Sequence, residues 1–424
     1  MIEQLVEKVE QEINEQFLIV KRVAETNQKR VLNAFQNQKV SDSHFNPTTG
    51  YGYDDFGRDT LESVYAEIFG GEDALVRPQI VSGTHAITTA LFGILRPFDE
   101  LLYITGKPYD TLEGVIGSEK HSNEGSLRDF NISYQAIPLT NTLEVDWENI
   151  KKNISTKTKV VAIQRSKGYA NRPSFTVTQI KNMVEFVKDI NPNIIVFVDN
   201  CYGEFVETIE PPHVGADLIA GSLIKNPGGG IARAGGYIVG KKELVKLAAN
   251  RLTAPGLGKE IGASIGMLQE MYQGLFLAPH VVEEALKGSI FTSRFLSVLG
   301  FSTSPAFDDQ RTDLIQSVNF ETAEQMIAFC QAIQKGSPVN SHVIPYPASM
   351  PGYEDQVIMA AGTFIQGASL ELTADGPIRP PYTAFVQGGL IYAHVKIAVT
   401  DAVIDLSKQN FLELNVKLNE ILSK

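Results

Sequence analysis

The stretch Asn193-Ile194-Ile195-Val196-Phe197-Val198-Asp199-Asn200 is an apolar run that ends in a carboxylate and an amide. A short, continuous apolar run predicts a strand covered on both faces, as in a parallel sheet. Further along, Leu218–Ser222 forms a second such run, and Lys225 follows it closely. Ligands of these sheets bind beyond the carboxyl ends of the strands. We therefore expect Asp199 and Lys225 to face a ligand site.

Candidate strands and helices alternate between about residues 75 and 250. The strand candidates are Pro78–Val81, Leu101–Thr105, Lys159–Gln164, Asn193–Asp199, Leu218–Ser222 and Gly236–Val239. Helical patterns lie between some of them, at Thr178–Asp189 and Lys241–Leu252. This alternation predicts βαβ units and an α/β fold with a mostly parallel sheet.

The two ends of the chain show sequence patterns that differ from those of the middle. At the start, Ile2, Leu5, Val6, Val9, Ile13 and Phe17 recur at helical spacing, and a turn-rich loop follows over residues 46–53. After about residue 290, short strands (Asp313–Asn319, Gln356–Ala360, Ser369–Thr373) surround helical patterns (Thr322–Lys335, Gly388–Leu406). We predict an N-terminal helix and arm over residues 1–55, a large domain over 56–288 and a smaller α+β domain over 289–424.

Composition excludes several classes of protein. With 37 Lys and Arg against 49 Asp and Glu, the net charge of −12 argues against nucleic-acid binding. We find no run of about 18 apolar residues that a membrane span requires. The N-terminus lacks the pattern of a signal peptide, and two cysteines cannot build a disulfide framework. We therefore expect a cytoplasmic protein.

Two glycine-rich stretches come close to nucleotide-binding motifs without matching them. Gly235–Lys242 lacks the Ser or Thr of a phosphate loop, and Gly228–Arg233 lacks the last glycine of the dinucleotide fingerprint. A nucleotide-binding α/β protein remains an alternative. The seven histidines show no tight ligand spacing, so no catalytic metal is expected. Cys201 and Cys330 are predicted to be small buried residues.

Pyridoxal 5'-phosphate (PLP) would account for both Asp199 and Lys225. Its aldehyde forms a Schiff base with a lysine, here Lys225, and its pyridinium nitrogen hydrogen-bonds a carboxylate, here Asp199. For either residue alone, an ion pair or a surface position is the simpler interpretation. The two together call for further evidence.

A candidate phosphate site lies upstream. Ser82, Gly83, Thr84 and His85 follow a predicted strand and open a helix that runs to about Leu95. Such a turn presents free N–H groups and the positive end of the helix dipole to an anion. Ser222 could add another donor.

An aromatic residue is expected over the planar ring of the cofactor. Tyr109 follows the next predicted strand and could stack there, offset as aromatic rings prefer. His85 is the rival for this position. Ordinary packing of Tyr109 is the alternative to a functional role.

Gly83, Tyr109, Val198-Asp199-Asn200 and Ser222-x-x-Lys225, in this order, resemble the cystathionine and methionine γ-lyase group of fold-type-I PLP enzymes. The runs Ser82–Ala86, Ile163–Ser166 and Asp375–Arg379 are most similar to bacterial proteins described as aluminium-resistance or methionine γ-lyase-like. The resemblance covers nearly the whole chain. It implies a three-layer αβα, aspartate-aminotransferase-like fold.

The resemblance also implies contributions from arginines and from a second subunit. Family members are homodimers or homotetramers in which an arm residue reaches the neighbour's cofactor phosphate, and Tyr51, Tyr53 and Arg58 occupy the matching stretch here. The compact Tyr-x-Arg spacing of the family is absent. For the substrate carboxylate, Arg379 is one candidate, with a surface pair to Asp375 as its alternative. Arg165 is the other candidate, in a run that departs from the family pattern.

The resulting hypothesis is a PLP-dependent carbon–sulfur lyase that acts on a sulfur-containing amino acid. In it Lys225 removes the α-proton and Tyr109 donates a proton to the leaving sulfur. β- or γ-elimination would give a 2-oxo acid, ammonia and a thiol. The alternatives are another PLP-dependent enzyme (an aldolase, aminotransferase or desulfurase) and a non-catalytic protein of the same fold.

Overall fold

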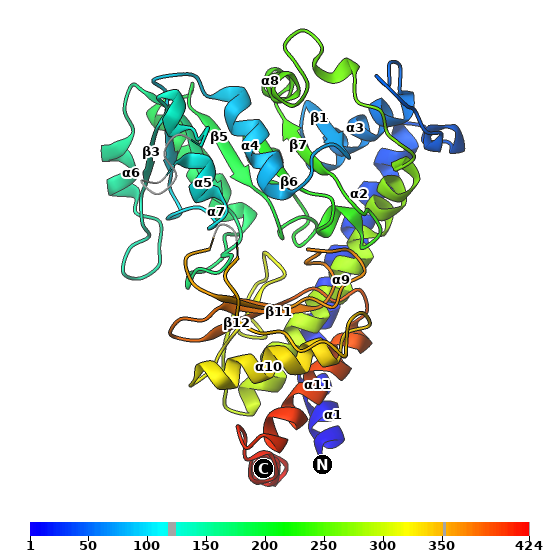
Figure 1. The fold of residues 1–424 in the computed structure, drawn as a ribbon, viewed down its shortest axis with the longest axis vertical. Helices are drawn as coiled ribbons and strands as arrows, with labels where there is room; N and C mark the ends of the chain where they lie inside the picture. Colours follow the sequence, from blue (N-terminus) through cyan, green and yellow to red (C-terminus); the bar gives the residue numbers. More distant parts are fainter. Residues whose placement is uncertain (118–123, 351–352, 424) are drawn as a thin grey trace.

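The computed structural model describes residues 1–117, 124–350 and 353–423, which form two sheet-containing units joined by long helices (Figure 1). The large sheet has seven strands in the order β1-β7-β6-β5-β4-β2-β3. Its strands are β1 Asp73–Arg77, β2 Glu100–Tyr103, β3 Ser133–Ala136, β4 Thr158–Gln164, β5 Ile195–Asp199, β6 Leu218–Ser222 and β7 Gly236–Gly240. β7 runs antiparallel to β1 and β6, and the other pairs are parallel.

Helices cover both faces of this sheet. Successive side chains of a strand point to opposite faces, so the continuous apolar strands present apolar side chains on both of them. Val160, Ala162 and Phe197 pack toward α4 Gly83–Ile94 and α8 Lys242–Leu252. Val161 and Val196 pack on the other side with α3 Phe56–Phe69 and α7 Val177–Ile190. The predicted three-layer αβα fold with a mostly parallel sheet is confirmed.

The second sheet is smaller and antiparallel, with the strand order β10-β11-β12-β9-β8. Its strands are β8 Ser302–Ser304, β9 Gln316–Asn319, β10 Val357–Ala360, β11 Thr373–Pro377 and β12 Thr383–Gln387. Helices α10 Ala323–Lys335 and α11 Tyr392–Lys408 pack together beside it (Figure 1). This unit matches the expected smaller α+β domain.

Long helices connect the two units. α9 Leu268–Val298 has 31 residues and lies against α2 Asn14–Asn37, and both pass from one sheet to the other (Figure 1). α1 Ile2–Glu12 packs against α9 and α12 Leu414–Leu422, so the two ends of the chain lie close together. The predicted boundary at residue 288 falls inside α9.

Shorter elements complete the secondary structure. They are the helices α5 Leu112–Ile116 and α6 Trp147–Asn153 and the 3₁₀ turns η1 Asp42–Phe45, η3 Arg128–Phe130, η4 Pro211–Val214, η5 Asn226–Gly228 and η6 Gly258–Glu260. Within the described ranges, we find no helix with both the length and the apolar character of a membrane span.

Some predicted strands were misplaced. The strand predicted at Pro78–Val81 was wrong, because β1 ends at Arg77 and the later residues form the turn into α4. β1 was missed because it begins with Asp73 and ends with Arg77, two charged residues that interrupt the apolar pattern of a strand. Arg77 is nevertheless buried, where it pairs with Glu62 of α3. The strand predicted at Ser369–Thr373 was also wrong, because β11 starts at Thr373 and includes residue types that strands usually lack. The predicted first helix is divided at Ile13.

Candidate functional site

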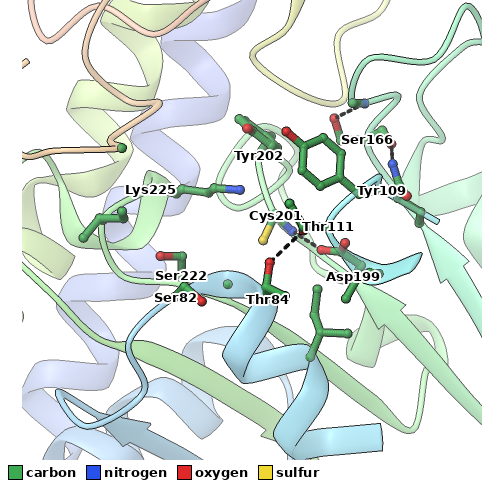
Figure 2. Close-up of a pocket in the computed structure, with 17 residues that line it drawn as sticks. Ser82, Thr84, Tyr109, Thr111, Ser166, Asp199, Cys201, Tyr202, Ser222 and Lys225 are labelled. Atoms are coloured by element: carbon green, nitrogen blue, oxygen red, sulfur yellow. Dashed lines mark hydrogen bonds between the residues drawn. The ribbon is translucent and has the colours of Figure 1, made fainter. Parts of the chain in front are cut away.

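A cavity of about 280 Å³ lies beyond the carboxyl ends of β4, β5 and β6 and at the start of α4 (Figure 2). The sequence-predicted residues that line it are Ser82, Gly83, Thr84, Tyr109, Asp199, Ser222 and Lys225. Each follows or ends a strand of the large sheet, or opens α4. The parallel topology therefore brings together residues that are far apart in the sequence.

The floor of the cavity has the features of an anion site. Ser82 caps α4, and its Oγ accepts a hydrogen bond from the His85 N–H at 3.0 Å. A Cβ at Gly83 would lie 3.3 Å from Cys201 Sγ, so a residue larger than glycine would reduce the space at this end of the cavity. Ser222 Oγ is buried and has no hydrogen-bond partner among the described residues. This turn could therefore hold a phosphate with its backbone N–H groups and Ser222.

Lys225 and Asp199 enter the cavity from opposite sides (Figure 2). Lys225 Nζ lies 4.0 Å from the centroid of the Tyr202 ring. Burial by itself lowers the pKa of Lys225, but Cys201, Tyr202 and Asp199 raise it above its ordinary value. Burial raises the pKa of Asp199, against the opposing effects of Lys225 and the Cys201 N–H. The Lys225 amine and the Asp199 carboxyl group thus lie on two sides of one cavity, an arrangement that fits a planar ring bound between them.

Tyr109 and His85 are placed differently. Tyr109 lines the cavity, and its hydroxyl lies 2.5 Å from that of Tyr353. His85 does not line it, and its Nδ1 accepts a hydrogen bond from the Val81 N–H at 3.1 Å. This bond turns the imidazole back toward the residues before α4. Tyr109 is therefore the better placed of the two for the predicted stacking.

The structure does not bring Arg165 to the cavity. Gln164 lines the cavity, and the next side chain points to the opposite face of the sheet. There the fully buried Arg165 guanidinium donates to Asn200 Oδ1 at 2.9 Å and pairs with Glu207 and Glu210. These contacts occupy the group and favour a structural role for it over the predicted binding of a substrate carboxylate.

Arg379 lies in a neighbouring cavity of about 290 Å³, which shares Tyr109 and Gln164 with the first. Its guanidinium pairs with Asp355 at 2.9 Å, and its side chain is 44% exposed. The alternative pairing with Asp375 is wrong, because Asp375 is buried and accepts from Gln387. Arg379 is accessible to a ligand that extends past Tyr109.

The predicted arm residues do not line this cavity. Tyr51 and Tyr53 are 66% and 58% exposed and stack with ring centroids 5.3 Å apart. Arg58 is buried and donates to the carbonyls of Gly52 and Gly262 at 2.8 and 3.2 Å. Arg58 therefore stabilises the loop of the arm through these two hydrogen bonds. The predicted contact of the arm with a neighbouring subunit stays a prediction.

Sequence reasoning did not assign a role to several residues of the site. Gln164, Cys201 and Tyr202 line the cavity at the ends of β4 and β5, so the strand-end rule that identified Asp199 could have found them. Tyr353 had no such signal, because it lies 244 residues from Tyr109. In the described ranges, no cluster of three or more His, Cys, Asp or Glu is arranged to hold a metal.

Comparisons with known proteins cover almost the whole chain. A family model described as methionine gamma-lyase matches residues 2–407. The uncharacterized protein YnbB of Bacillus subtilis is 64% identical over 393 residues, which are 93% of this chain and 93% of that protein.

Solved structures agree with this match. A Listeria innocua protein, provisionally named a cystathionine beta-lyase involved in aluminium resistance, is 64% identical with a TM-score of 0.93, over 95% of this chain and 98% of that one. A Clostridium novyi protein, named a carbon–sulfur lyase involved in aluminium resistance, is 49% identical with a TM-score of 0.91, over 95% of each chain. YhfS of Escherichia coli, described as PLP-dependent, is 16% identical with a TM-score of 0.59, over 90% of this chain and 96% of that one, and shares the fold.

Proposed function

The chain belongs to the methionine gamma-lyase family, and on this basis we propose that it is a PLP-dependent carbon–sulfur lyase acting on a sulfur-containing amino acid. The observation that supports this most is the position of Lys225 and Asp199 on opposite sides of one cavity, above a turn at the start of α4 that could hold a phosphate. The names of the Listeria and Clostridium structures favour the same reaction class.

The residues of the cavity fit the parts of the cofactor. Ser82, Gly83 and Thr84 would hold its phosphate at the start of α4, with Ser222 Oγ as a further donor. Asp199 would accept a hydrogen bond from the ring nitrogen, and Tyr109 would lie against the ring. When bound, the cofactor supplies an electron sink that stabilises a carbanion at Cα of the amino acid.

The side chains of the chain would then carry the proton transfers. Lys225 would hold the cofactor covalently, and its free amine would be the base that takes the α-proton of the bound amino acid. Tyr109 is proposed to give its hydroxyl proton to the sulfur as the C–S bond breaks, so that a neutral thiol leaves. Arg379 is the better placed candidate for the substrate carboxylate, since Arg165 is held elsewhere.

Lys225→Ala tests the proposal, with Lys246→Ala on the exposed face of α8 as the matched control. We expect purified wild-type protein to take up PLP and show the visible absorbance band of a lysine-bound cofactor, which Lys225→Ala alone should lose. A 2-oxo acid assay with L-methionine, L-cystathionine and S-alkyl cysteines should then detect turnover.

Two results would contradict the proposal in different ways. Wild-type protein that takes up no PLP would overturn the cofactor assignment. Protein that shows the band and releases no thiol from any of these amino acids would overturn the lyase assignment and favour another role for the fold.

A further inference from the structure

Three tyrosines form a cluster beside the cavity: Tyr109, which lines it, and Tyr169 and Tyr353, whose rings pack against Tyr109. The Tyr109 and Tyr353 hydroxyls are 2.5 Å apart, and their rings meet edge to face with centroids separated by 6.1 Å. The Tyr169 ring lies 5.7 Å from that of Tyr109 and 5.8 Å from that of Tyr353. The cluster is therefore a packed unit whose shortest polar contact joins Tyr353 to the residue proposed as general acid.

The tyrosine cluster joins the two sheets of the molecule. Tyr109 and Tyr169 follow strands β2 and β4 of the large sheet, whereas Tyr353 precedes β10 of the small one. Tyr169 also hydrogen-bonds Asp375 on β11 and packs 5.2 Å from the ring of Phe385 on β12. Tyr353 thus contacts two residues that follow strands of the large sheet, and one of them, Tyr169, is itself held against the small sheet.

The two hydroxyls differ in how readily they lose a proton. Burial raises the pKa of Tyr109 well above its ordinary value, and Tyr202, Tyr353 and Asp375 raise it further. Burial raises the pKa of Tyr353 to about 12, while its hydrogen bond with Tyr109 lowers it, and Tyr202, Asp375 and Asp110 lie close enough to raise it. A phenolate at Tyr109 is therefore less stable than one at Tyr353.

We propose that Tyr353 is the residue that returns a proton to Tyr109 during turnover, an inference that rests on the proposed lyase function. As the C–S bond breaks, its electron pair stays on sulfur and the Tyr109 proton forms the S–H bond. The Tyr109 phenolate takes the Tyr353 proton across the 2.5 Å contact, and half-buried Tyr353 takes one from water. Tyr353 acts through Tyr109 and is a positioning residue in this scheme.

Substrates with different leaving groups distinguish a role of Tyr353 in proton transfer from a purely structural role. A thiolate must be protonated as it leaves, whereas chloride leaves without a proton. We compare Tyr353→Phe with wild type on S-ethyl-L-cysteine and on β-chloro-L-alanine, measuring pyruvate formation. If the enzyme performs only γ-elimination, L-methionine and O-acetyl-L-homoserine form the equivalent pair, because acetate also leaves as an anion.

We expect Tyr353→Phe to lower kcat about tenfold on the thioether, as the loss of one hydrogen bond to the reacting group would, with little change on the chloride. Tyr109→Phe should show the same selectivity with a larger loss, on the order of 10²- to 10⁴-fold. Tyr346→Phe is the matched control, because Tyr346 is exposed in the segment that leads to Tyr353, and neither rate should change.

Three outcomes would overturn the inference or its premise. An equal loss on both substrates would give Tyr353 a structural role only, and no loss on either would show that its hydroxyl is not used. The cofactor band and the chloride rate report whether the variant is folded, so a damaged variant is recognised. Wild-type protein inactive on these four substrates and on L-cystathionine would instead contradict the proposed function.

Discussion

Glu204 is a second buried acid close to the site, behind the residues that line the cavity. Its side chain is fully buried, and Oε1 accepts a hydrogen bond from the Tyr237 hydroxyl at 2.7 Å. Oε2 has no hydrogen-bond partner among the described residues. Burial raises the pKa of Glu204 to about 8, despite the opposing hydrogen bond from Tyr237. The carboxyl group is therefore protonated at neutral pH.

This ionisation predicts a pH dependence of stability. An unfolded Glu titrates near pH ~4.3, so between that pH and about 8 the folded state holds a proton that the unfolded state has lost. Stability must fall as pH rises through this window, by on the order of a few kcal/mol. Glu204→Gln keeps an acceptor for Tyr237 and cannot ionise. We expect the variant to lose this contribution, measured by urea unfolding at pH 6 and pH 8.

The control for Glu204 is Glu148→Gln, an exposed position on α6 that should keep the wild-type pH dependence. If Glu204→Gln also keeps it, the Glu204 carboxyl group ionises near its ordinary pKa, and the assignment of a neutral buried acid is wrong.

The residues that the sequence could locate share one property. Asp199, Ser222 and Lys225 end or follow continuous apolar strands, and a polar residue at such a point indicates a ligand site in a parallel sheet. Glu204 and Tyr353 lie in irregular segments, and their partners are distant along the chain. Only the packing of the folded molecule shows that they lie next to residues of the site.

At the scale of elements, the turn after Lys225 depends on a close approach to α9. η5 Asn226–Gly228 leads into Gly229, which has a φ of +57°. A Cβ at Gly274 of α9 would lie 2.2 Å from the Gly228 carbonyl oxygen, and one at Gly229 would lie 2.2 Å from that of Gly274. The glycines that nearly match a dinucleotide motif in the sequence thus allow two backbone segments to touch.

Gly274→Ala should therefore destabilise the protein by about 1–3 kcal/mol, although alanine normally favours a helix over glycine. Because the displaced turn follows Lys225 directly, we also expect weaker PLP binding, measured by titration of the absorbance band. The control is Gly114→Ala in α5, where an added Cβ meets no atom within 4 Å. Equal stability and PLP affinity in the two variants would contradict this role of the contact.

Element prediction succeeded where hydrophobic patterning was strong. Leu218–Ser222 matches β6, and Lys159–Gln164 differs from β4 by one residue. β3, β8 and β12 were not predicted, and β3 and β8 are edge strands with exposed residues. Edge strands of this kind are specified by pairing with a neighbour rather than by an apolar run, so their local sequence carries little signal.

At the scale of the molecule, the cavity contains fewer cations than its proposed ligands would require. Lys225 is the only Lys or Arg of the described residues that lines it, because Arg58 and Arg165 are held elsewhere and Arg379 lies in the neighbouring cavity. A bound phosphate dianion alone would carry more negative charge than this lysine balances. The exposed Tyr51 and Tyr53, and Val81 beside the phosphate turn, are surfaces that a second copy of the chain could cover.

We therefore predict that the protein is a homodimer or homotetramer in which the arm of one subunit completes the site of another. Light scattering should give a mass at least twice that of one chain. The Tyr51→Ala, Tyr53→Ala double variant should bind PLP more weakly and lose most activity, because each subunit would lack hydroxyls that a neighbour supplies to the phosphate.

Mixed oligomers test this arrangement directly. Lys225→Ala chains keep the arm and lack the lysine, whereas the double tyrosine variant keeps the lysine and lacks the arm hydroxyls. In a dimer of one chain of each kind, one site has both its own Lys225 and an intact arm from its neighbour. Unfolding and refolding the two impaired proteins together should restore roughly a quarter of wild-type activity, since random pairing makes half of the dimers mixed and each has one intact site. If each chain completes its own site, no mixture can regain activity, because every chain carries a defect in the site that it forms.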